Sequence, residues 1–353
     1  MGRMKSITYN FRKSSVHSKN SGVLPDATES TQNTNNFGYN DYLYLVLLII
    51  NTIIMAILGT FVNRDFPDSE SYTTIVQYFQ GTAPLDSLKP PFSYRPLLPF
   101  MASLLPFDVE TSFLLYNGFF LIVISFSFYF IALHFNIPKY AAFLSTSACM
   151  STHTVLYYGT AILVDTPALA MMSLAALLMT KKQSNRTWIS ILLLISLGVA
   201  FKETAIVMAL AYLLKSRDIL RSIPMVVLPG SIYLIDRILF DPSGEIGYFW
   251  SLGSYNFEHL DATLLVFILG LMNQLPFVII GIVGIWKKWC EDNGSLQWFG
   301  MMGISTLFIL LFGLIFGYFS TRFIWPMYIA LIPLIGLGID LFITKLRGFI
   351  RPT

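Results

Sequence analysis

Charged residues are scarce in this chain. Only 12% of its 353 residues are Asp, Glu, Lys or Arg, whereas 55% are hydrophobic. A soluble globule needs far more polar surface, so the composition excludes one and predicts an integral membrane protein. The net charge of +3 does not indicate nucleic-acid binding, because the basic residues stand singly or in pairs beside apolar runs, where they anchor a membrane protein. We expect membrane lipids as partners and no nucleic acid.

The chain has only two cysteines, and several catalytic signatures are missing. Cys149 lies in an apolar run and Cys290 beside lysines, so the two would sit at different depths of a bilayer without forming a disulfide. There is no GxxxxGK[ST], HExxH, GxSxG or paired CxxC pattern, which removes the usual signatures of nucleotide-loop enzymes, zinc proteases, serine hydrolases and structural zinc sites. No pattern requires a cofactor. A divalent metal held by Glu258, His259 and Asp261 stays an open alternative.

Polar and apolar stretches divide the chain into three parts. Residues 1–40 are rich in Ser, Asn, Thr and Lys without an apolar period, which predicts a disordered cytoplasmic tail. The first apolar run begins too late for a cleavable signal peptide, so it is expected to be an uncleaved anchor. Residues 41–346 are expected to form a single transmembrane domain, followed by a cytoplasmic tail at 347–353.

Several apolar runs are long enough to cross the membrane as helices, since about 20 residues cover roughly 30 Å of hydrocarbon. They lie at about 42–62, 111–133, 140–158, 223–240, 263–286, 297–317 and 323–343. Lys and Arg clusters flank one side of these runs, and almost every Asp and Glu falls in loops on the other side. By the positive-inside rule both termini are predicted to be cytoplasmic, in the cell membrane or in the endoplasmic reticulum membrane of a eukaryote.

Two further apolar stretches are too short to span a bilayer. The run at 166–180 places Asp165 only about 22 Å from the cytoplasmic helix end. Within 186–215, two arms of about a dozen residues meet at Lys202 and Glu203, about 20 Å deep. Lipid cannot satisfy charges at this depth, so these groups must line a cavity, which should face outward. The predicted fold is an all-α polytopic bundle of about eight full spans plus a short re-entrant hairpin.

The first outer loop, residues 63–110, is expected to carry two interfacial helices. Apolar residues recur at helical spacing from Tyr72 to Phe79, and again from Leu97 to Leu105. Helices with one apolar side at this place would lie on the membrane surface and roof the cavity.

Three acidic positions are candidates for chemistry, each with a structural alternative. Asp68 and Glu70 begin the first interfacial helix, where they either cap it or, partly desolvated at the cavity rim, supply a general base. Asp165 either caps the short helix that follows it or is a functional group at membrane depth.

Three basic positions are candidates for anion binding. Lys202 either neutralises its neighbour Glu203 or, with the adjacent helix N-terminus, holds an anion such as phosphate. Arg95 either extends to lipid headgroups or positions Asp68 or a phosphate. Arg322 begins the last span at its outer end among aromatic residues, which breaks the cytoplasmic preference of basic residues and indicates a phosphate or headgroup partner.

In order along the chain, these segments resemble the GT-C fold of polyprenol-dependent membrane glycosyltransferases, which include protein O-mannosyltransferases and lipid A aminoarabinose transferases. The resemblance runs from about Tyr42 to Leu346 and is carried by the acidic motif Asp68, Glu70 and Tyr72, the segment Tyr94 to Leu97, the helix start Asp165 to Pro167, the break Lys202 to Thr204, and Arg322.

The resemblance implies a glycosyltransferase that moves a sugar from a polyprenyl-phosphate-type donor to an acceptor hydroxyl at the extracytoplasmic face. The acceptor would be a protein, a lipid or a glycan. Asp68 would be the general base, with Glu70 or Asp65 as substitutes, and Arg322 and Lys202 would contact the donor phosphate. The resemblance also implies inversion at the anomeric carbon.

Other residues are expected around this site, and another function stays open. Arg95 is a further candidate for the donor phosphate, while Asp165, Glu203, Tyr72 and His259 are expected to line the cavity. A multi-span transporter or flippase would use the same buried charges as a substrate or proton path, and a polymerase or ligase of lipid-linked glycans is a third alternative. The lack of an internal repeat and the outward concentration of charge favour the transferase.

Overall fold

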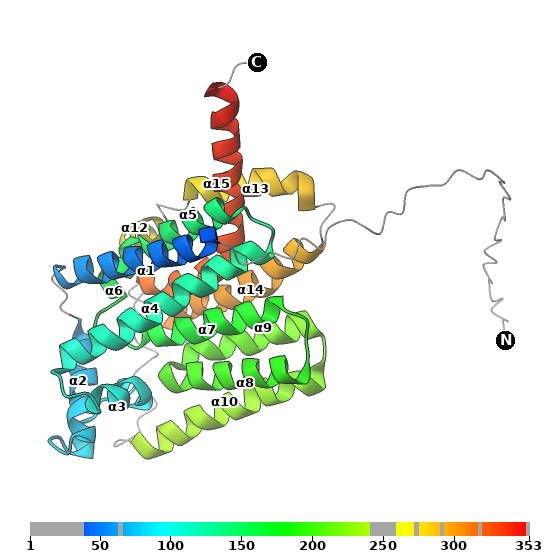
Figure 1. Ribbon diagram of the computed structural model, residues 1–353. Coiled ribbons are helices and arrows are strands. Elements are labelled where there is room, and N and C mark those ends of the chain that lie inside the picture. Colours follow the sequence, from blue (N-terminus) through cyan, green and yellow to red (C-terminus); the bar gives the residue numbers. More distant parts are fainter. Residues whose placement is uncertain are drawn as a thin grey trace, which may run out of the picture. The chain divides into compact units, whose positions relative to one another are not determined.

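The computed structural model describes residues 39–62, 66–240, 259–271, 275–289, 293–316 and 320–350. Every regular element within these ranges is a helix, so the predicted all-α class is confirmed there (Figure 1). The elements up to residue 180 are α1 (Tyr39–Thr60), α2 (Pro67–Phe79), η1 (Leu85–Ser87), η2 (Phe92–Tyr94), α3 (Leu97–Ser103), α4 (Val109–His134), α5 (Lys139–Met150), α6 (His153–Tyr158) and α7 (Asp165–Thr180). The later elements are α8 (Asn185–Phe201), η3 (Glu203–Ile206), α9 (Val207–Ser216), α10 (Ile219–Phe240), α12 (Leu260–Leu271), α13 (Leu275–Trp289), α14 (Asn293–Phe316), η5 (Thr321–Phe323), η6 (Trp325–Met327) and α15 (Tyr328–Ile350).

Five helices in the described ranges are long and apolar enough to cross a membrane. They cover Asp41–Thr60, Val109–His134, Ile219–Phe240, Gln297–Ile315 and Thr321–Arg347. Each of them matches a predicted span closely. The predicted tail at 1–40 and the acidic outer loop between α10 and α12 fall almost wholly outside the described residues.

The two remaining predicted spans are not single helices in the described structure. The run at 140–158 breaks into α5 and α6, because the Thr152 side chain accepts a hydrogen bond from the Val155 amide and starts a new helix. The run at 263–286 is divided between α12 and α13, and residues 272–274 between them lie outside the described part. The total of about eight spans therefore stays a prediction.

Helix α7 is buried on nearly all of its sides. It packs between α4 and α8 and also meets α9. Its side chains after Asp165 are apolar or small, and most of those between Thr166 and Met179 are buried. A helix that is apolar all round belongs in a core, so its first residue, Asp165, is held inside protein.

Helices α8 and α9 are separated by a break at Lys202, where the sequence places it, while the re-entrant hairpin itself stays a prediction. The backbone of Lys202 is extended (φ −159°, ψ 129°), which ends α8 before the short η3 and α9 begin. The arms have 17 and 10 residues, against 26 in α4. At about 1.5 Å per residue both arms are much shorter than α4, so the break lies partway along the bundle.

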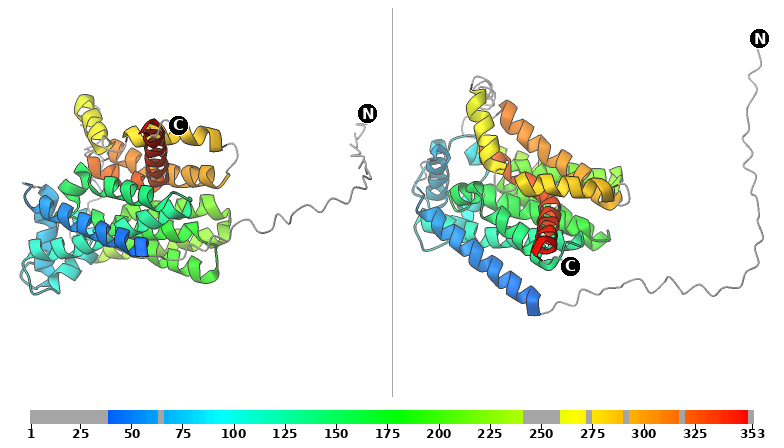
Figure 2. Two further views of the ribbon diagram at one scale, coloured as in Figure 1. Left: turned by 45° about the horizontal axis from the view of Figure 1, so that its top comes forward. Right: turned by 90° about the horizontal axis from the view of Figure 1, so that it is seen from above.

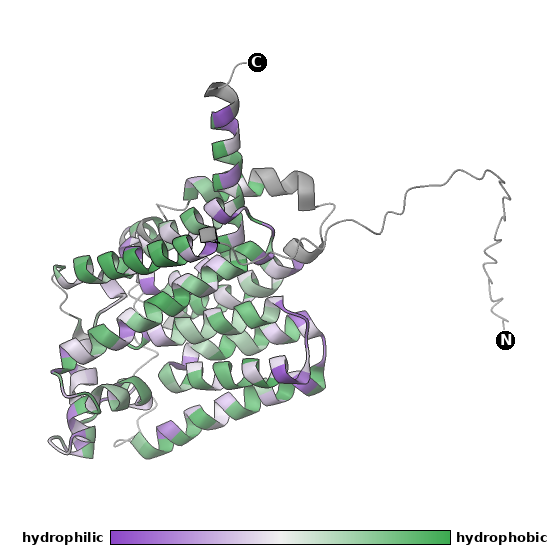
Figure 3. Cartoon of the chain, viewed as in Figure 1, coloured by the Kyte–Doolittle hydropathy of each residue, from purple (hydrophilic) through white to green (hydrophobic). Residues whose placement is uncertain are grey.

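The two ends of this helix group differ in charge. The turns that follow α7 and α9 lie at one end and carry Lys181, Lys182 and Arg217, whereas α2 and the start of α7 lie at the other end (Figures 1 and 2). Figure 3 shows hydrophilic residues at those turns and hydrophobic residues along α1 and α10. Only 11% of the α10 span is buried, as expected for a helix whose side chains face lipid.

The two helices expected in the first outer loop are present as α2 and α3. The expectation that lipid covers the apolar side is wrong for α2. Tyr72, Ile75 and Val76 are at most 1% exposed, and they belong to the protein core. α2 packs on α3 and η2, and α3 in turn packs on α4. The apolar side of α2 is thus covered by protein, which fixes the position of α2 more rigidly than a lipid surface would.

A separate group of polar contacts ties α1 and α15 to α5. Lys139 donates to Asp41 over 2.7 Å, and the Tyr129 hydroxyl lies 3.3 Å from the same carboxylate. Tyr140, which like Lys139 is on α5, donates its hydroxyl to Asp340 of α15. These polar contacts involve neither α2 nor α3, so they hold helices of the bundle together independently of the first outer loop.

Candidate functional site

Six charged side chains from five separate parts of the chain form two neighbouring groups of ion pairs. Three are acids and three are cations, so their formal charges cancel. They are Asp68 on α2, Arg95 after η2, Asp165 at the start of α7, Lys202 at the end of α8, Glu203 in η3, and Arg322 in η5.

Arg322 joins the first loop helix to α7. Its Nη1 donates to Oδ2 of Asp68 over 2.7 Å, although the two residues are 254 positions apart. The same nitrogen lies 3.9 Å from Oδ2 of Asp165. One guanidinium therefore faces two carboxylates, and a planar cation with several donors is well suited to that position.

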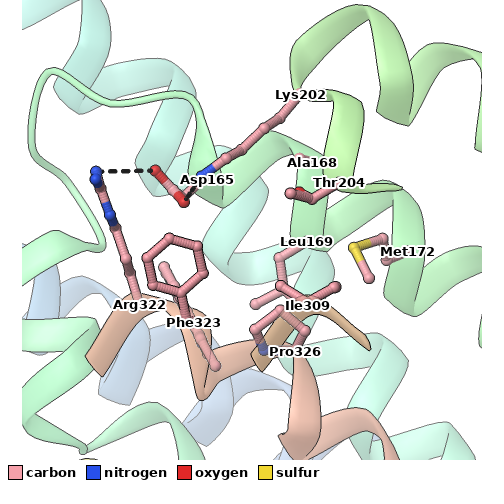
Figure 4. A pocket seen from close by; sticks show the side chains of 11 residues that line it. Asp165, Ala168, Leu169, Met172, Lys202, Thr204, Ile309, Arg322, Phe323 and Pro326 are labelled. Atoms are coloured by element: carbon pink, nitrogen blue, oxygen red, sulfur yellow. Dashed lines mark hydrogen bonds and ion pairs between the residues drawn. The ribbon is translucent and has the colours of Figure 1, made fainter. Parts of the chain in front are cut away.

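Lys202 completes this first group. Its ammonium donates to Oδ1 of Asp165, so the Asp165 carboxylate lies between Lys202 and Arg322 (Figure 4). The side chains of Lys202 and Asp165 are 7% and 10% exposed. A buried charge that loses its partner is costly, which makes each member of this group depend on the others.

Arg95 and Glu203 form the second group. Nε and Nη2 of Arg95 donate to the two carboxylate oxygens of Glu203 over 2.8 and 2.5 Å, a bidentate geometry. Nη1 of Arg95 donates to the Tyr72 hydroxyl over 3.1 Å. Burial disfavours the charged form of Arg95, but Glu203 and Tyr72 together outweigh burial and hold the pKa of Arg95 well above its usual value. Arg95 thus joins η3, at the break between α8 and α9, to α2.

A pocket lies beside the first group, with polar side chains at one end and apolar walls. Its internal volume is about 20 Å³, which is room for about one water molecule. Figure 4 shows Asp165, Lys202 and Arg322 at the polar end. The Phe323 ring centre lies 5.8 Å from the cationic groups of both Lys202 and Arg322, close enough for cation–π attraction. The other lining residues are Ala168, Leu169, Met172, Thr204, Ile309, Trp325 and Pro326.

The structural alternatives fare differently. The N-cap residues of α2 and α7 make no side-chain cap bond, and Asp68 and Asp165 lie in the first turns of these helices, where they also face the positive end of the helix dipole. Lys202 and Glu203 are adjacent, yet each bonds a partner on another element. Arg95 is only 7% exposed, which rules out extension to lipid headgroups.

The other predicted site residues are not gathered with this group. Glu70 is on the exposed side of α2, and Asp65 lies outside the described residues. His259 and Asp261 are exposed near the start of α12, and Glu258 is outside the described part. Within the described residues no cluster of three His, Cys, Asp or Glu side chains is suited to a metal ion.

The apolar walls of the pocket were missed by reasoning from the sequence. Leu169, Met172 and Ile309 read as ordinary core residues in apolar runs, and only the folded chain places them beside charges. Phe323 carried a signal, because it follows Arg322 directly, but its aromatic neighbours indicated a membrane-interface belt. Its observed position beside two cations assigns it to the pocket.

Comparison of the chain with protein-family models found no match, and a search of curated proteins found none either.

Proposed function

We propose that the chain is a membrane glycosyltransferase that moves a sugar from a polyprenyl-phosphate-type donor to an acceptor hydroxyl at the extracytoplasmic face. The observation that carries this proposal is that Lys202 and Arg322 line one partly apolar pocket, while Arg322 also bonds the carboxylate of Asp68 outside its lining. An anionic lipid needs cations and an apolar wall together, and acid–base chemistry needs a carboxylate next to them.

The charge of each side chain determines its role in the proposed reaction. The acceptor oxygen attacks the anomeric carbon, its proton passes to Asp68, and the bond from that carbon to the phosphate oxygen breaks. Lys202 and Arg322 stabilise the departing polyprenyl phosphate, because they lie where its negative charge develops. Inversion at the carbon follows from a single displacement. The acceptor is a protein, lipid or glycan hydroxyl.

Asp68 is bonded to Arg322 in the free protein, which bears on its role as a base. In the proposed reaction Arg322 turns toward the donor phosphate, and Asp68 then becomes available to the acceptor hydroxyl.

The proposal is tested by comparing Asp68→Asn with Glu70→Gln in a sugar-transfer assay with purified protein. Asp68→Asn is expected to lower the rate at least ~100-fold, since general-base catalysis contributes roughly that much or more. Glu70→Gln removes a charge from the exposed side of the same helix and is the matched control. Equal activity of Asp68→Asn and the wild type would remove Asp68 from the mechanism.

A transporter or flippase is the second candidate, favoured by one observation. The three acids and three cations balance in formal charge, as do many buried paths for ions or protons in membranes. A transporter moves its substrate unchanged across the membrane of a sealed vesicle, whereas a transferase releases polyprenyl phosphate without needing a closed compartment.

A further inference from the structure

One carboxylate at the polar end of the pocket contacts two cations. Oδ1 of Asp165 accepts from Lys202, and its Oδ2 lies 3.9 Å from Nη1 of Arg322. Proteins commonly hold phosphate in this way, with Lys and Arg donors on different oxygens of one anion. The place that suits a phosphate is therefore taken by a side chain of the protein itself (Figure 4).

The pocket walls next to this carboxylate are apolar. Leu169, Met172 and Ile309 line the space that begins at Lys202, and Thr204 adds one hydroxyl to the lining. A ligand whose chemistry matches both ends has an anionic head and an apolar tail, as a prenyl phosphate has. The walls must move apart to admit the tail, because the space between them is only about 20 Å³.

Charge decides what must happen when such a ligand enters. The six ionic side chains balance, so a bound phosphodiester would leave an excess negative charge in a site of low dielectric constant. A phosphodiester and a carboxylate each carry one negative charge. Exchange of one for the other keeps the balance at Lys202 and Arg322 when the displaced Asp165 carboxylate turns toward solvent, whereas addition does not.

We infer that Asp165 is an internal competitor of the donor phosphate, and that the phosphate binds by replacing the Asp165 carboxylate between Lys202 and Arg322. This inference rests on the proposed function and adds a role for Asp165 in it. Arg322 also bonds Asp68, so the same exchange draws Arg322 away from the proposed base. After transfer, Asp165 returns to the two cations and promotes release of the lipid phosphate.

The exchange is tested by titrating the purified full-length chain in detergent with farnesyl phosphate at about pH 5, where this phosphomonoester carries close to one negative charge, as the phosphodiester of the donor does. Asp165→Asn keeps the size of the side chain but removes its charge, so it is expected to bind farnesyl phosphate about tenfold more tightly than the wild type, a change of about 1.4 kcal/mol. Farnesol, which has no phosphate, is expected to bind both proteins equally. Weaker or unchanged binding of farnesyl phosphate by Asp165→Asn would overturn the inference, as would an equal gain for farnesol.

Asp41→Asn is the matched control. Asp41 is also a buried carboxylate that accepts from a lysine, Lys139, over 2.7 Å, but it lies outside the pocket. Its substitution is expected to leave the affinity for farnesyl phosphate unchanged. A gain equal to that of Asp165→Asn would show a general effect of charge and contradict the inference.

A second variant covers the case in which Asp165→Asn does not fold. Asp165→Glu keeps the charge that Lys202 needs and extends the carboxylate further into the pocket, so farnesyl phosphate is expected to bind at least ~threefold more weakly. Binding as tight as in the wild type would overturn the exchange. Absence of farnesyl phosphate binding in the wild type would instead overturn the proposed function, and the inference with it.

Discussion

Buried charged residues in this chain form ion pairs with residues that are distant in the sequence. Lys202 and Glu203 are neighbours, yet their partners are Asp165 and Arg95. The extended backbone at Lys202 explains this, because successive side chains of an extended segment point in opposite directions. The sequence indicated which residue types had to be satisfied inside the protein, but it could not indicate how they pair.

The pair of Arg95 and Glu203 gives a prediction about stability. Arg95→Met leaves a partly buried carboxylate without its cation and is expected to lower the free energy of unfolding by about 3 kcal/mol. Glu203→Gln in the same chain removes the stranded charge and is expected to recover most of that loss. Thermal unfolding in detergent of the single and double variants measures both effects. A double variant no more stable than Arg95→Met would contradict the pairing.

Among the helices, the long apolar runs and the break at Lys202 were predictable from the sequence, but the break between α5 and α6 was not. The five long helices follow from run length alone, since the number of apolar residues fixes whether a helix can span. The break between α5 and α6 depends on one Thr152 hydroxyl, and the position of α2 depends on partners elsewhere in the chain. The expectation that lipid covers the apolar side of α2 was wrong, because an apolar stripe does not reveal whether lipid or protein covers it.

The start of α4 gives a prediction about pH. The Thr111 amide and hydroxyl both donate to Asp108, which lowers the pKa of this carboxyl below its usual value of 3.8. A lowered pKa contributes stability above the unfolded value and loses it as the pH falls through the folded value. Asp108→Ala is therefore expected to lower the unfolding temperature at neutral pH, with a gap that closes in acid. Asp108→Asn keeps an acceptor oxygen, so its unfolding temperature should lie between those of the wild type and Asp108→Ala. A difference between the wild type and Asp108→Ala that does not depend on pH would contradict this explanation.

Close packing of α13 on α15 gives a prediction about a helix pair. A Cβ on Gly338 would lie 2.0 Å from the Phe277 carbonyl oxygen, so Gly338→Ala is expected to separate the helices and cost about 1–3 kcal/mol. Gly303→Ala on α14 is the matched control, because a Cβ there meets nothing within 4 Å. Thermal unfolding in detergent compares the two variants. Equal stability would show that α13 and α15 do not pack this closely.

For the molecule as a whole, the charge difference between the two ends gives a prediction about topology. In a chain with Cys149 and Cys290 replaced by Ser, Thr82→Cys and Lys182→Cys place single thiols at exposed positions near opposite ends of the helix group. A maleimide that cannot cross membranes is expected to label residue 82 in intact cells and residue 182 only after permeabilisation. The reverse pattern would turn the pocket toward the cytoplasm and contradict an extracytoplasmic reaction.

If the ion pairs that link Asp68, Arg322, Asp165 and Lys202 form a site for sugar transfer, the purified wild-type chain must release a lipid phosphate. The most direct measurement incubates it with a panel of polyprenyl-phosphate sugars and candidate acceptors, and follows that release. We predict release with at least one donor, dependent on the acceptor and at least ~100-fold slower in Asp68→Asn. Uptake of an unchanged substrate into sealed vesicles, with no release from any donor, would contradict the proposed function.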